Sequence, residues 1–333
     1  MTSTTVPNES AKQAQEGRLS VGEKIGYGLG DTASNLYWKI FEFFLMYFYT
    51  DVFGISAKSA GTMMLVTRIW DAINDPFVGY IADRTKTAWG RFRPYLVWFC
   101  VPFAITGSLT FYTPDLGPTG KLIYAYATYT LVMMVYTAIN IPYSALMGVI
   151  SPSSLERTSV STYRLVLAFV GGIIVQYFTL ELVGIYGGTE TAIVDGVEKE
   201  VVINEQAGFF WTMVTFSVAA VILFLITFAT TKERVEPQVE MASTFKSDWY
   251  FLRTSLKLHQ ILLIGLAALI ALSTGFDTQA LPWIVGGYVL ASLLMLLVRA
   301  IAMKSNAGQS QEQSTFELDF NDLLANRPWL VLF

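Results

Sequence analysis

The stretch Arg68-Ile69-Trp70-Asp71-Ala72-Ile73-Asn74-Asp75-Pro76 places two carboxylates inside an apolar run that extends over about residues 56–82. About 20 mostly apolar residues in a helix are enough to cross the hydrocarbon core of a bilayer. Charged side chains within such a helix are costly, so they indicate a functional site. The stretch therefore predicts a membrane-spanning helix that carries a site.

Asp71 and Asp75 are four residues apart, which puts both carboxylates on one helix face about one turn apart. Two negative charges at that separation repel each other. A bound monovalent cation or a shared proton relieves the repulsion, and Arg68 on the same side is able to neutralise one acid. The pattern favours a cation site. The alternative is an Arg68–Asp71 pair that only ties helices together.

Further apolar runs of similar length lie on both sides of this one. They cover about residues 25–50, 95–113, 121–149, 160–186, 208–230, 260–276 and 282–303. Only 14% of the 333 residues are charged, against about 25% in soluble domains. The predicted fold class is an all-α membrane protein with a six-helix N-domain and an additional helical hairpin.

Several function classes are excluded by composition. The net charge of −4 argues against a nucleic-acid partner. A single cysteine, Cys100, and a single histidine, His259, leave no cysteine or histidine metal cluster and no His-based triad. The chain is therefore not expected to be an enzyme or to hold a metal beyond a coupling cation.

Basic and acidic residues alternate between successive loops, and this predicts the orientation in the membrane. Cytoplasmic loops of membrane proteins are enriched in Lys and Arg. The basic residues are Arg84, Lys86, Arg91 and Arg93 after the second run and Lys232 and Arg234 after the sixth, whereas Glu190, Asp195, Glu198, Glu200 and Glu205 lie between the fifth and the sixth. The N-terminus is therefore expected to be cytoplasmic.

The remaining segments divide the chain into five regions. They are a disordered cytoplasmic tail (1–20), the six-helix domain (21–231), a cytoplasmic or interfacial linker (232–258), the extra transmembrane hairpin (259–304), and a linker with the truncated start of a next span (305–333). Ser20 and Glu23 have capping-box spacing, which predicts a helix start. We expect a truncated chain that does not transport by itself.

Polar residues occur in other apolar runs as well. Asp31 and Asn35 are spaced i,i+4 in the first run, and Lys39 continues their face; alternatively, Asp31 only lies near the cytoplasmic helix end. Pro142 removes a backbone hydrogen bond, and a kink near Asn140 is expected to open a polar cavity or to serve packing alone.

Arg164 and a glycine run complete the polar features of the spans. A guanidinium in the membrane needs partners, and vicinal sugar hydroxyls or a carboxylate fit its fork; alternatively, Arg164 reaches the cytoplasmic interface. Gly26, Gly28 and Gly30 follow no strand, so they indicate close helix packing rather than a phosphate loop.

The basic loop after the second run carries a specific pattern. Gly79, Asp83 and Arg84, followed by Gly90-Arg91-Phe92-Arg93-Pro94, are similar to the loop-2/3 motif of the major facilitator superfamily. Together with Tyr49-Thr50-Asp51-Val52 and the 68–76 stretch, they resemble the glycoside–pentoside–hexuronide:cation symporters, the family of melibiose permease. The resemblance covers about residues 24–234 and resumes at 323–329.

The resemblance implies roles for individual residues. Asp71 and Asp75 fall on the coupling-cation site, with Thr137 at a helper position. Asn35, Tyr136, Asn140 and Arg164 fall on sugar-contacting positions, to which we add Asp31 as a candidate. The loop motif that implies a conformational role comprises Gly79, Asp83, Arg84, Gly90, Arg91 and Arg93.

The sequence also departs from the family pattern. Asn35 and Asn140 stand where melibiose permease has carboxylates, and Ser144 stands where it has a tryptophan. These changes favour a glycoside other than a galactoside, or an acidic sugar that carboxylates would repel.

The sequence therefore predicts a secondary active transporter of the inner membrane that couples sugar or glycoside symport to Na⁺, Li⁺ or H⁺ by alternating access. The expected partners are a sugar or glycoside, a monovalent cation and the bilayer, with no nucleic acid and no cofactor. The alternatives are a membrane sensor or assembly subunit that does not transport, and a transporter of a lipid or other amphiphile. The presence of both Asp71 and Asp75 favours transport, because a scaffold would not need both.

Overall fold

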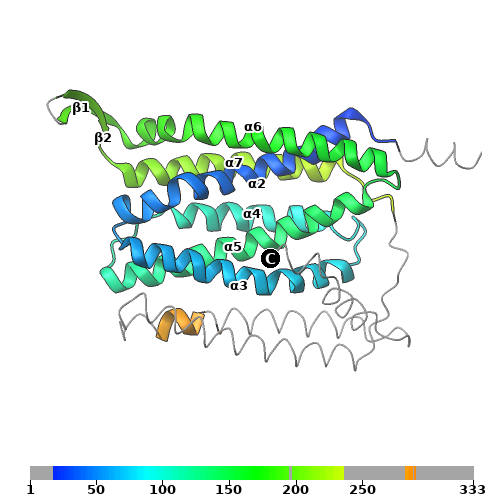
Figure 1. Ribbon diagram of the computed structural model, residues 1–333, viewed down its shortest axis with the longest axis horizontal. Coiled ribbons are helices and arrows are strands. Elements are labelled where there is room, and N and C mark those ends of the chain that lie inside the picture. The colour runs from blue at the N-terminus through cyan, green and yellow to red at the C-terminus, as the bar shows by residue number, and fades with distance from the viewer. Residues whose placement is uncertain (1–17, 195–196, 236–281, 288, 290–333) are drawn as a thin grey trace, which may run out of the picture. The chain divides into compact units, whose positions relative to one another are not determined.

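The computed structural model describes residues 18–194, 197–235, 282–287 and 289, and six long helices dominate this part of the chain (Figure 1). The helices are α2 (Val21–Tyr47), α3 (Ala57–Arg84), α4 (Arg93–Thr110), α5 (Pro118–Val149), α6 (Ser154–Gly187) and α7 (Glu205–Thr230). A π-helix, η1 (Phe48–Val52), extends α2, and strands β1 (Thr189–Val194) and β2 (Val197–Val202) lie between α6 and α7.

The first six predicted spans each coincide with one of these helices, which confirms the all-α membrane architecture. By length and composition, α5, α6 and α7 are the described helices that are able to cross a membrane. Helices α2 and α3 are less apolar because they carry the charged residues discussed above. The tail at 1–17, residues 236–281 and residues 290–333 lie outside the described residues, and with them most of the predicted linkers and extra hairpin. Residues 282–287 and 289, which fall within the predicted hairpin, are described and are helical.

The segment between α6 and α7 was expected only to be an acidic loop, and it forms an antiparallel hairpin instead. Thr189 pairs with Val202, and Val194 pairs with Val197 at the turn. In the sequence Val-Glu-Lys-Glu-Val-Val of β2, β-branched valines flank three charged residues, which suits a short exposed strand.

Helix α2 lies at the centre of the packing. It lies along α6 and α7, while α4 packs on α5 and α7, and α3 packs mainly on α5 (Figure 1). A Cβ added to Gly28 would come within 2.6 Å of Leu167 on α6, and one on Gly30 within 2.6 Å of Tyr143 on α5. The glycine run therefore permits close helix packing, as predicted.

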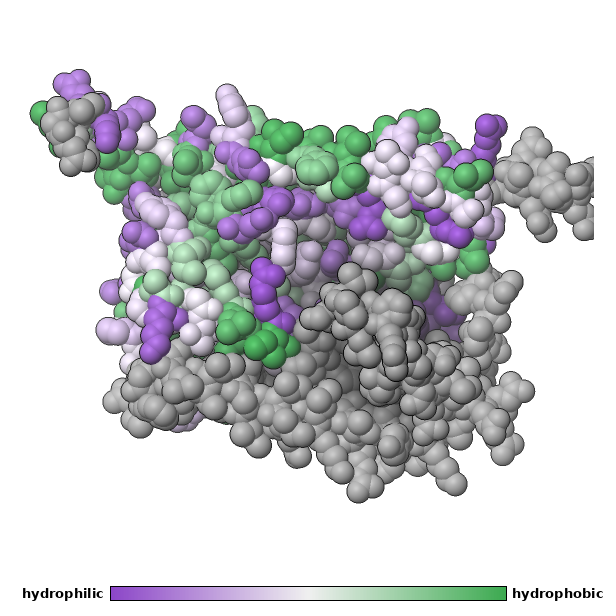
Figure 2. Space-filling view, in the orientation of Figure 1, coloured by the Kyte–Doolittle hydropathy of each residue, from purple (hydrophilic) through white to green (hydrophobic). Residues whose placement is uncertain are grey.

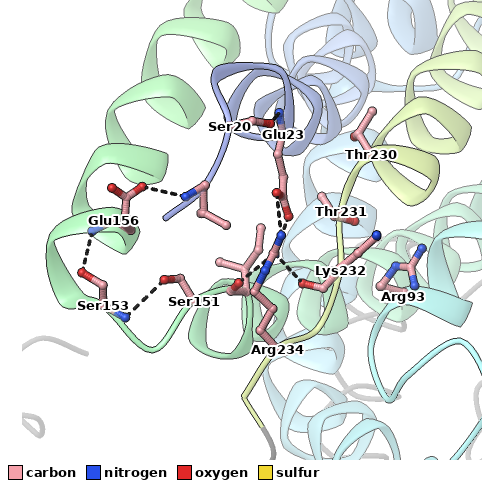
Figure 3. A network of polar contacts seen from close by, with 12 residues as sticks. Ser20, Glu23, Arg93, Ser151, Ser153, Glu156, Thr230, Thr231, Lys232 and Arg234 are labelled. Carbon is pink, nitrogen blue, oxygen red and sulfur yellow. Dashed lines mark hydrogen bonds and ion pairs between the residues drawn. The ribbon is translucent and has the colours of Figure 1, made fainter. Parts of the chain in front are cut away.

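The start of α2 is held by a long-range ion pair. Ser20 Oγ accepts the N–H of Glu23 at 3.2 Å, which confirms the predicted cap. The carboxylate of Glu23 does not complete the expected capping box. It binds Arg234 Nη1 and Nη2 at 2.5 and 2.9 Å and so joins α2 to the segment after α7 (Figure 3).

Candidate functional site

Helices α3 and α5 bring the three predicted cation residues together. Thr137 Oγ1 on α5 donates to Asp75 Oδ1 on α3 at 3.3 Å. Asp71 is only 9% exposed, and its buried Oδ1 has no hydrogen-bond partner within the described part of the chain. The charge of Asp75 also acts unfavourably on Asp71. A buried, unsatisfied carboxylate oxygen is costly, so this donor set fits a monovalent cation.

Arg68 does not form the ion pair that sequence reasoning left open. Its side chain is exposed, and its guanidinium lies 5.1 Å from the ring centroid of Trp38 on α2. Among the described residues it forms no ion pair with Asp71 or Asp75, although its charge acts on Asp71 from a distance. The alternative of an Arg68–Asp71 tie between helices is therefore wrong.

Arg164 on α6 and Asp31 on α2 form a two-point ion pair. Nε of Arg164 contacts Asp31 Oδ2, and Nη2 lies 3.1 Å from Oδ1. The side chains are 24% and 13% exposed, and the guanidinium lies 5.0 Å from the ring centroid of Tyr143. Tyr143 Oη is 3.1 Å from Asp31 Oδ2. Arg164 thus has a carboxylate partner rather than extending to the interface, and Asp31 is part of the helix packing.

The other predicted sugar residues lie on α2 and α5. Asn35 Nδ2 donates to the carbonyl oxygen of Asp31 at 2.9 Å. Tyr136 stacks on Trp38 with ring centroids 5.7 Å apart. Asn140, one turn further along α5, is half-buried, and its amide has no hydrogen-bond partner among the described residues. Helix α5 continues through Pro142, so the expected kink does not interrupt it.

The cation and sugar candidates share one short segment of α5. Tyr136 contacts Trp38 of α2, while its neighbour Thr137 bonds Asp75 of α3. A ligand that moves the cation candidate Thr137 therefore also moves the sugar candidate Tyr136, because both residues belong to α5. Sequence reasoning missed Trp38 and Tyr143, and the only signal for either was an aromatic residue at helical spacing from a polar one.

The loop motif binds the carboxylate of Glu233, which lies in the segment after α7. The backbone N–H groups of Arg91, Phe92 and Arg93 donate to the carboxylate of Glu233 at 2.8, 2.7 and 3.0 Å. These groups form the N-terminus of α4, where a negative charge is favoured. Gly90 has φ +110°, and a Cβ there would lie 2.5 Å from Glu233 Cδ. The motif therefore anchors the segment after α7 to the start of α4.

Other motif residues have different surroundings. Arg93 Nη2 donates to the carbonyl oxygen of Phe228 at 2.7 Å, while Asp83 is exposed at the end of α3. Gly79 leaves ordinary space, since a Cβ there would lie 3.7 Å from Ile141. Arg84 is the last residue of α3. The motif's members thus do not converge on one point.

Replacing Glu233 with Gln should lower the thermal midpoint of the purified protein in detergent. The neutral amide offers one acceptor oxygen where the carboxylate offers two, and it lacks the charge that α4 favours. The expected loss is roughly 2 kcal/mol, the scale of hydrogen bonds to a charged group. Glu181→Gln, at an exposed carboxylate of α6, is the control. Equal midpoints for the two variants would contradict this role of Glu233.

Comparison with known proteins identifies sugar transporters and symporters as relatives of this chain. The family model described as MFS/sugar transport protein matches residues 26–281. The inner membrane symporter YicJ of Escherichia coli (strain K12) is 44% identical over 218 residues, which are 66% of this chain and 44% of the relative. The isoprimeverose transporter of Lactiplantibacillus pentosus is 39% identical over 214 residues, 64% of this chain and 42% of the relative.

A third relative extends the match. The glucuronide carrier protein homolog of Escherichia coli (strain K12) is 31% identical over 274 residues, 82% of this chain and 56% of the relative. The chain spans about half the length of the curated relatives it matches. These relatives are transporters rather than enzymes, and they confirm the resemblance to glycoside and cation symporters. Because the family model covers most of its residues, the chain belongs to the MFS/sugar transport protein family.

Proposed function

We propose that this chain supplies one six-helix half of a cation-coupled sugar or glycoside symporter of the inner membrane that works by alternating access. The observation that carries the proposal is the buried Asp71 oxygen without a hydrogen-bond partner, next to the Asp75–Thr137 pair.

Asp71, Asp75 and Thr137 would hold the coupling cation, which is Na⁺, Li⁺ or H⁺. Two carboxylates concentrate negative charge in a half-buried place, and a single positive charge relieves their repulsion. The Thr137 hydroxyl already points at Asp75 and offers a neutral oxygen as a further ligand.

The substrate would be held between α2, α5 and α6. Asn35, Tyr136 and Asn140 present amide and hydroxyl groups, and Arg164 is fixed in place by Asp31. Relatives named as an isoprimeverose transporter and a glucuronide carrier homolog support a sugar or glycoside as the class of substrate.

The shared segment of α5 would couple the two sites. A cation that binds at Thr137 and Asp75 favours the arrangement of α5 in which Tyr136 and Asn140 meet the sugar. Linkage makes this effect reciprocal, so sugar also raises the affinity for the cation.

The charge distribution supports a cytoplasmic N-terminus. The basic residues Arg93, Lys232 and Arg234 gather beside the start of α2 (Figure 3), whereas the acidic β-hairpin follows the opposite end of α6 (Figure 1). Cytoplasmic ends of membrane helices are enriched in Lys and Arg.

Equilibrium binding of a sugar panel to the purified protein in lipid nanodiscs tests the proposal, and Asn140→Ala is the informative variant. The loss of one buried hydrogen-bond partner is expected to weaken binding about tenfold. Thr162→Ala removes an exposed hydroxyl that, among the described residues, bonds only the Thr158 carbonyl oxygen of its own helix α6, so it should leave the affinity unchanged. Unchanged affinity of Asn140→Ala for every sugar would remove Asn140 from the site.

A further inference from the structure

Arg68 of α3 has an aromatic ring as its partner rather than a carboxylate. Its side chain is exposed, and its guanidinium lies 5.1 Å from the ring centroid of Trp38 on α2. Hydrophilic side chains lie along α2 in Figure 2, so a charged group beside this helix does not face a purely apolar surface. A cation on an aromatic face at an exposed position is held weakly. The side chain of Arg68 is therefore able to leave Trp38 at little cost.

Asp71 offers a second position within reach of Arg68. The two residues are three positions apart on α3, which places them on one helix face with about 5–6 Å between their Cβ atoms. The charge of Arg68 already acts favourably on Asp71. Tyr129 of α5 is affected by the charges of both residues, so both lie near the same part of α5. A rotation of the Arg68 side chain, without a shift of α3, is enough to bring the guanidinium to Asp71.

The carboxylate of Asp71 is a stronger partner for Arg68 than the ring of Trp38. Asp71 is buried, and its Oδ1 has no hydrogen-bond partner in the part of the chain that the structure describes. A charge-assisted hydrogen bond from a guanidinium to such an oxygen is stronger than a cation–π contact. The same carboxylate would hold the coupling cation in the proposed function. Arg68 and the coupling cation therefore compete for Asp71.

The position of Arg68 on Trp38 is connected to the sugar candidates. Trp38 stacks on Tyr136 of α5 with ring centroids 5.7 Å apart and an interplanar angle of 20°. The guanidinium of Arg68 adds a third member to this pair of rings. Movement of Arg68 from Trp38 to Asp71 would remove that member, so the surroundings of both rings depend on which position Arg68 takes.

We propose that Arg68 is an internal competitor of the coupling cation, bound to Asp71 when the cation is absent and to Trp38 when the cation is present. A cation at Asp71 repels the guanidinium, which then returns to Trp38 and supports the stack of Trp38 on Tyr136. Departure of the cation reverses both changes. Arg68 thus neutralises the empty cation site and couples its occupancy to the rings beside the sugar. This inference rests on the proposed cation site at Asp71 and Asp75.

Calorimetric titration of Na⁺ and of Li⁺ into the complete chain in lipid nanodiscs measures the competition. Arg68→Met removes the competitor, so the cation should bind about tenfold more tightly than in the wild type. Apparent affinity scales with the fraction of molecules whose site is open, so a tenfold change means that Arg68 binds Asp71 in about nine-tenths of cation-free molecules. Trp38→Leu removes the other position of Arg68, so the cation should bind about threefold more weakly, the scale of one exposed cation–π contact.

Further variants separate competition from general effects of the substitutions. In Arg68→Met/Trp38→Leu, the loss of Trp38 should add nothing to the effect of Arg68→Met, because no competitor remains. Trp38→Phe keeps an aromatic ring and should restore most of the wild-type affinity. Lys121→Met is the control, because it removes a cation that lies 5.5 Å from the ring centroid of Phe53, about 24 Å along α5 from Thr137. It should change the affinity by less than about twofold.

Fluorine NMR of the chain labelled with 5-fluorotryptophan follows the position of Arg68 directly. The chain has eight tryptophans, and the signal of Trp38 is identified by its absence in Trp38→Phe. Na⁺ should shift this signal in the wild type, because the guanidinium returns to the ring. The same addition should leave the signal unchanged in Arg68→Met.

Two results would overturn the competition while the cation site stands, since the wild-type chain still binds the ion. One is that Arg68→Met binds the cation no more tightly than the wild type. The other is that the Trp38 signal responds equally to Na⁺ with and without Arg68. If neither Na⁺ nor Li⁺ binds the wild-type chain, the competition fails together with the assignment of these ions to Asp71 and Asp75.

Discussion

Replacing either Asp71 or Asp75 with Asn is expected to abolish the effect of Na⁺ or Li⁺ on sugar binding, while sugar binding without the cation survives. Each substitution removes one of the two carboxylates whose combined charge attracts the ion, and Thr137 alone supplies only a neutral oxygen. The site's affinity depends on both charges, because the cation must give up its hydration shell to enter a half-buried place.

Two measurements check this result in the wild-type chain and the variants. One is sugar affinity with and without each cation. The other is the shift of the thermal midpoint on adding cation, since a ligand at 100 times its Kd stabilises the protein by about 2.7 kcal/mol. The wild type should shift and the variants should not.

Asp115→Asn is the control because it neutralises an exposed carboxylate in the loop between α4 and α5, outside the residues assigned to the sites. It should keep the full response to the cation. If the double variant Asp71→Asn/Asp75→Asn still binds sugar more tightly in Na⁺, the assignment of the cation site is wrong.

Asp71 and Asp75 could be predicted as cation residues from the sequence because the pattern that identifies them lies within a single helix. Asp71 and Asp75 lie one turn apart within an apolar run, and the helix itself places them on one face. Thr137 came only from the family resemblance, since its contact with Asp75 depends on how α3 packs on α5.

The Asp31–Arg164 pair illustrates where sequence reasoning stops. The sequence leaves three possibilities for the guanidinium, namely a carboxylate, sugar hydroxyls or the cytoplasmic interface, and Asp31 lies 133 positions away from Arg164. Which partner it takes is set by the packing of α2 along α6, which the small residues Gly28 and Gly171 allow. Local sequence patterns do not indicate how α2 is positioned along α6.

Glu233 and the β-hairpin were missed for a similar reason. Glu233 follows the last turn of α7 in a basic segment, and only the tertiary fold places it at the N-terminus of α4. The hairpin has strands of only six residues, and neither Thr-Glu-Thr-Ala-Ile-Val nor Val-Glu-Lys-Glu-Val-Val alternates polar and apolar residues along its length, so the pattern does not predict a strand.

Arg164→Ala is expected to destabilise the protein strongly, because it leaves the carboxylate of Asp31, only 13% exposed, without its cation. Removing one partner of a buried pair typically costs about 3–5 kcal/mol. The double variant Asp31→Asn/Arg164→Ala should be more stable than Arg164→Ala alone, since no uncompensated charge remains. Arg164→Lys should fall between wild type and Arg164→Ala, because an ammonium keeps the charge but not the two-point contact.

A double-mutant cycle on the thermal midpoint in detergent separates this pairing from general packing effects of the two side chains. Lys39→Met is the matched control in the same helix bundle: it breaks an exposed ion pair of 29% and 47% exposure and should cost at most about 1 kcal/mol. A strong positive coupling between Asp31 and Arg164, far above the control, identifies the pair as the electrostatic link between α2 and α6. Additive effects of the two single substitutions would instead mean that Arg164 contributes through its stacking on Tyr143, and its charge would then be free to meet the substrate.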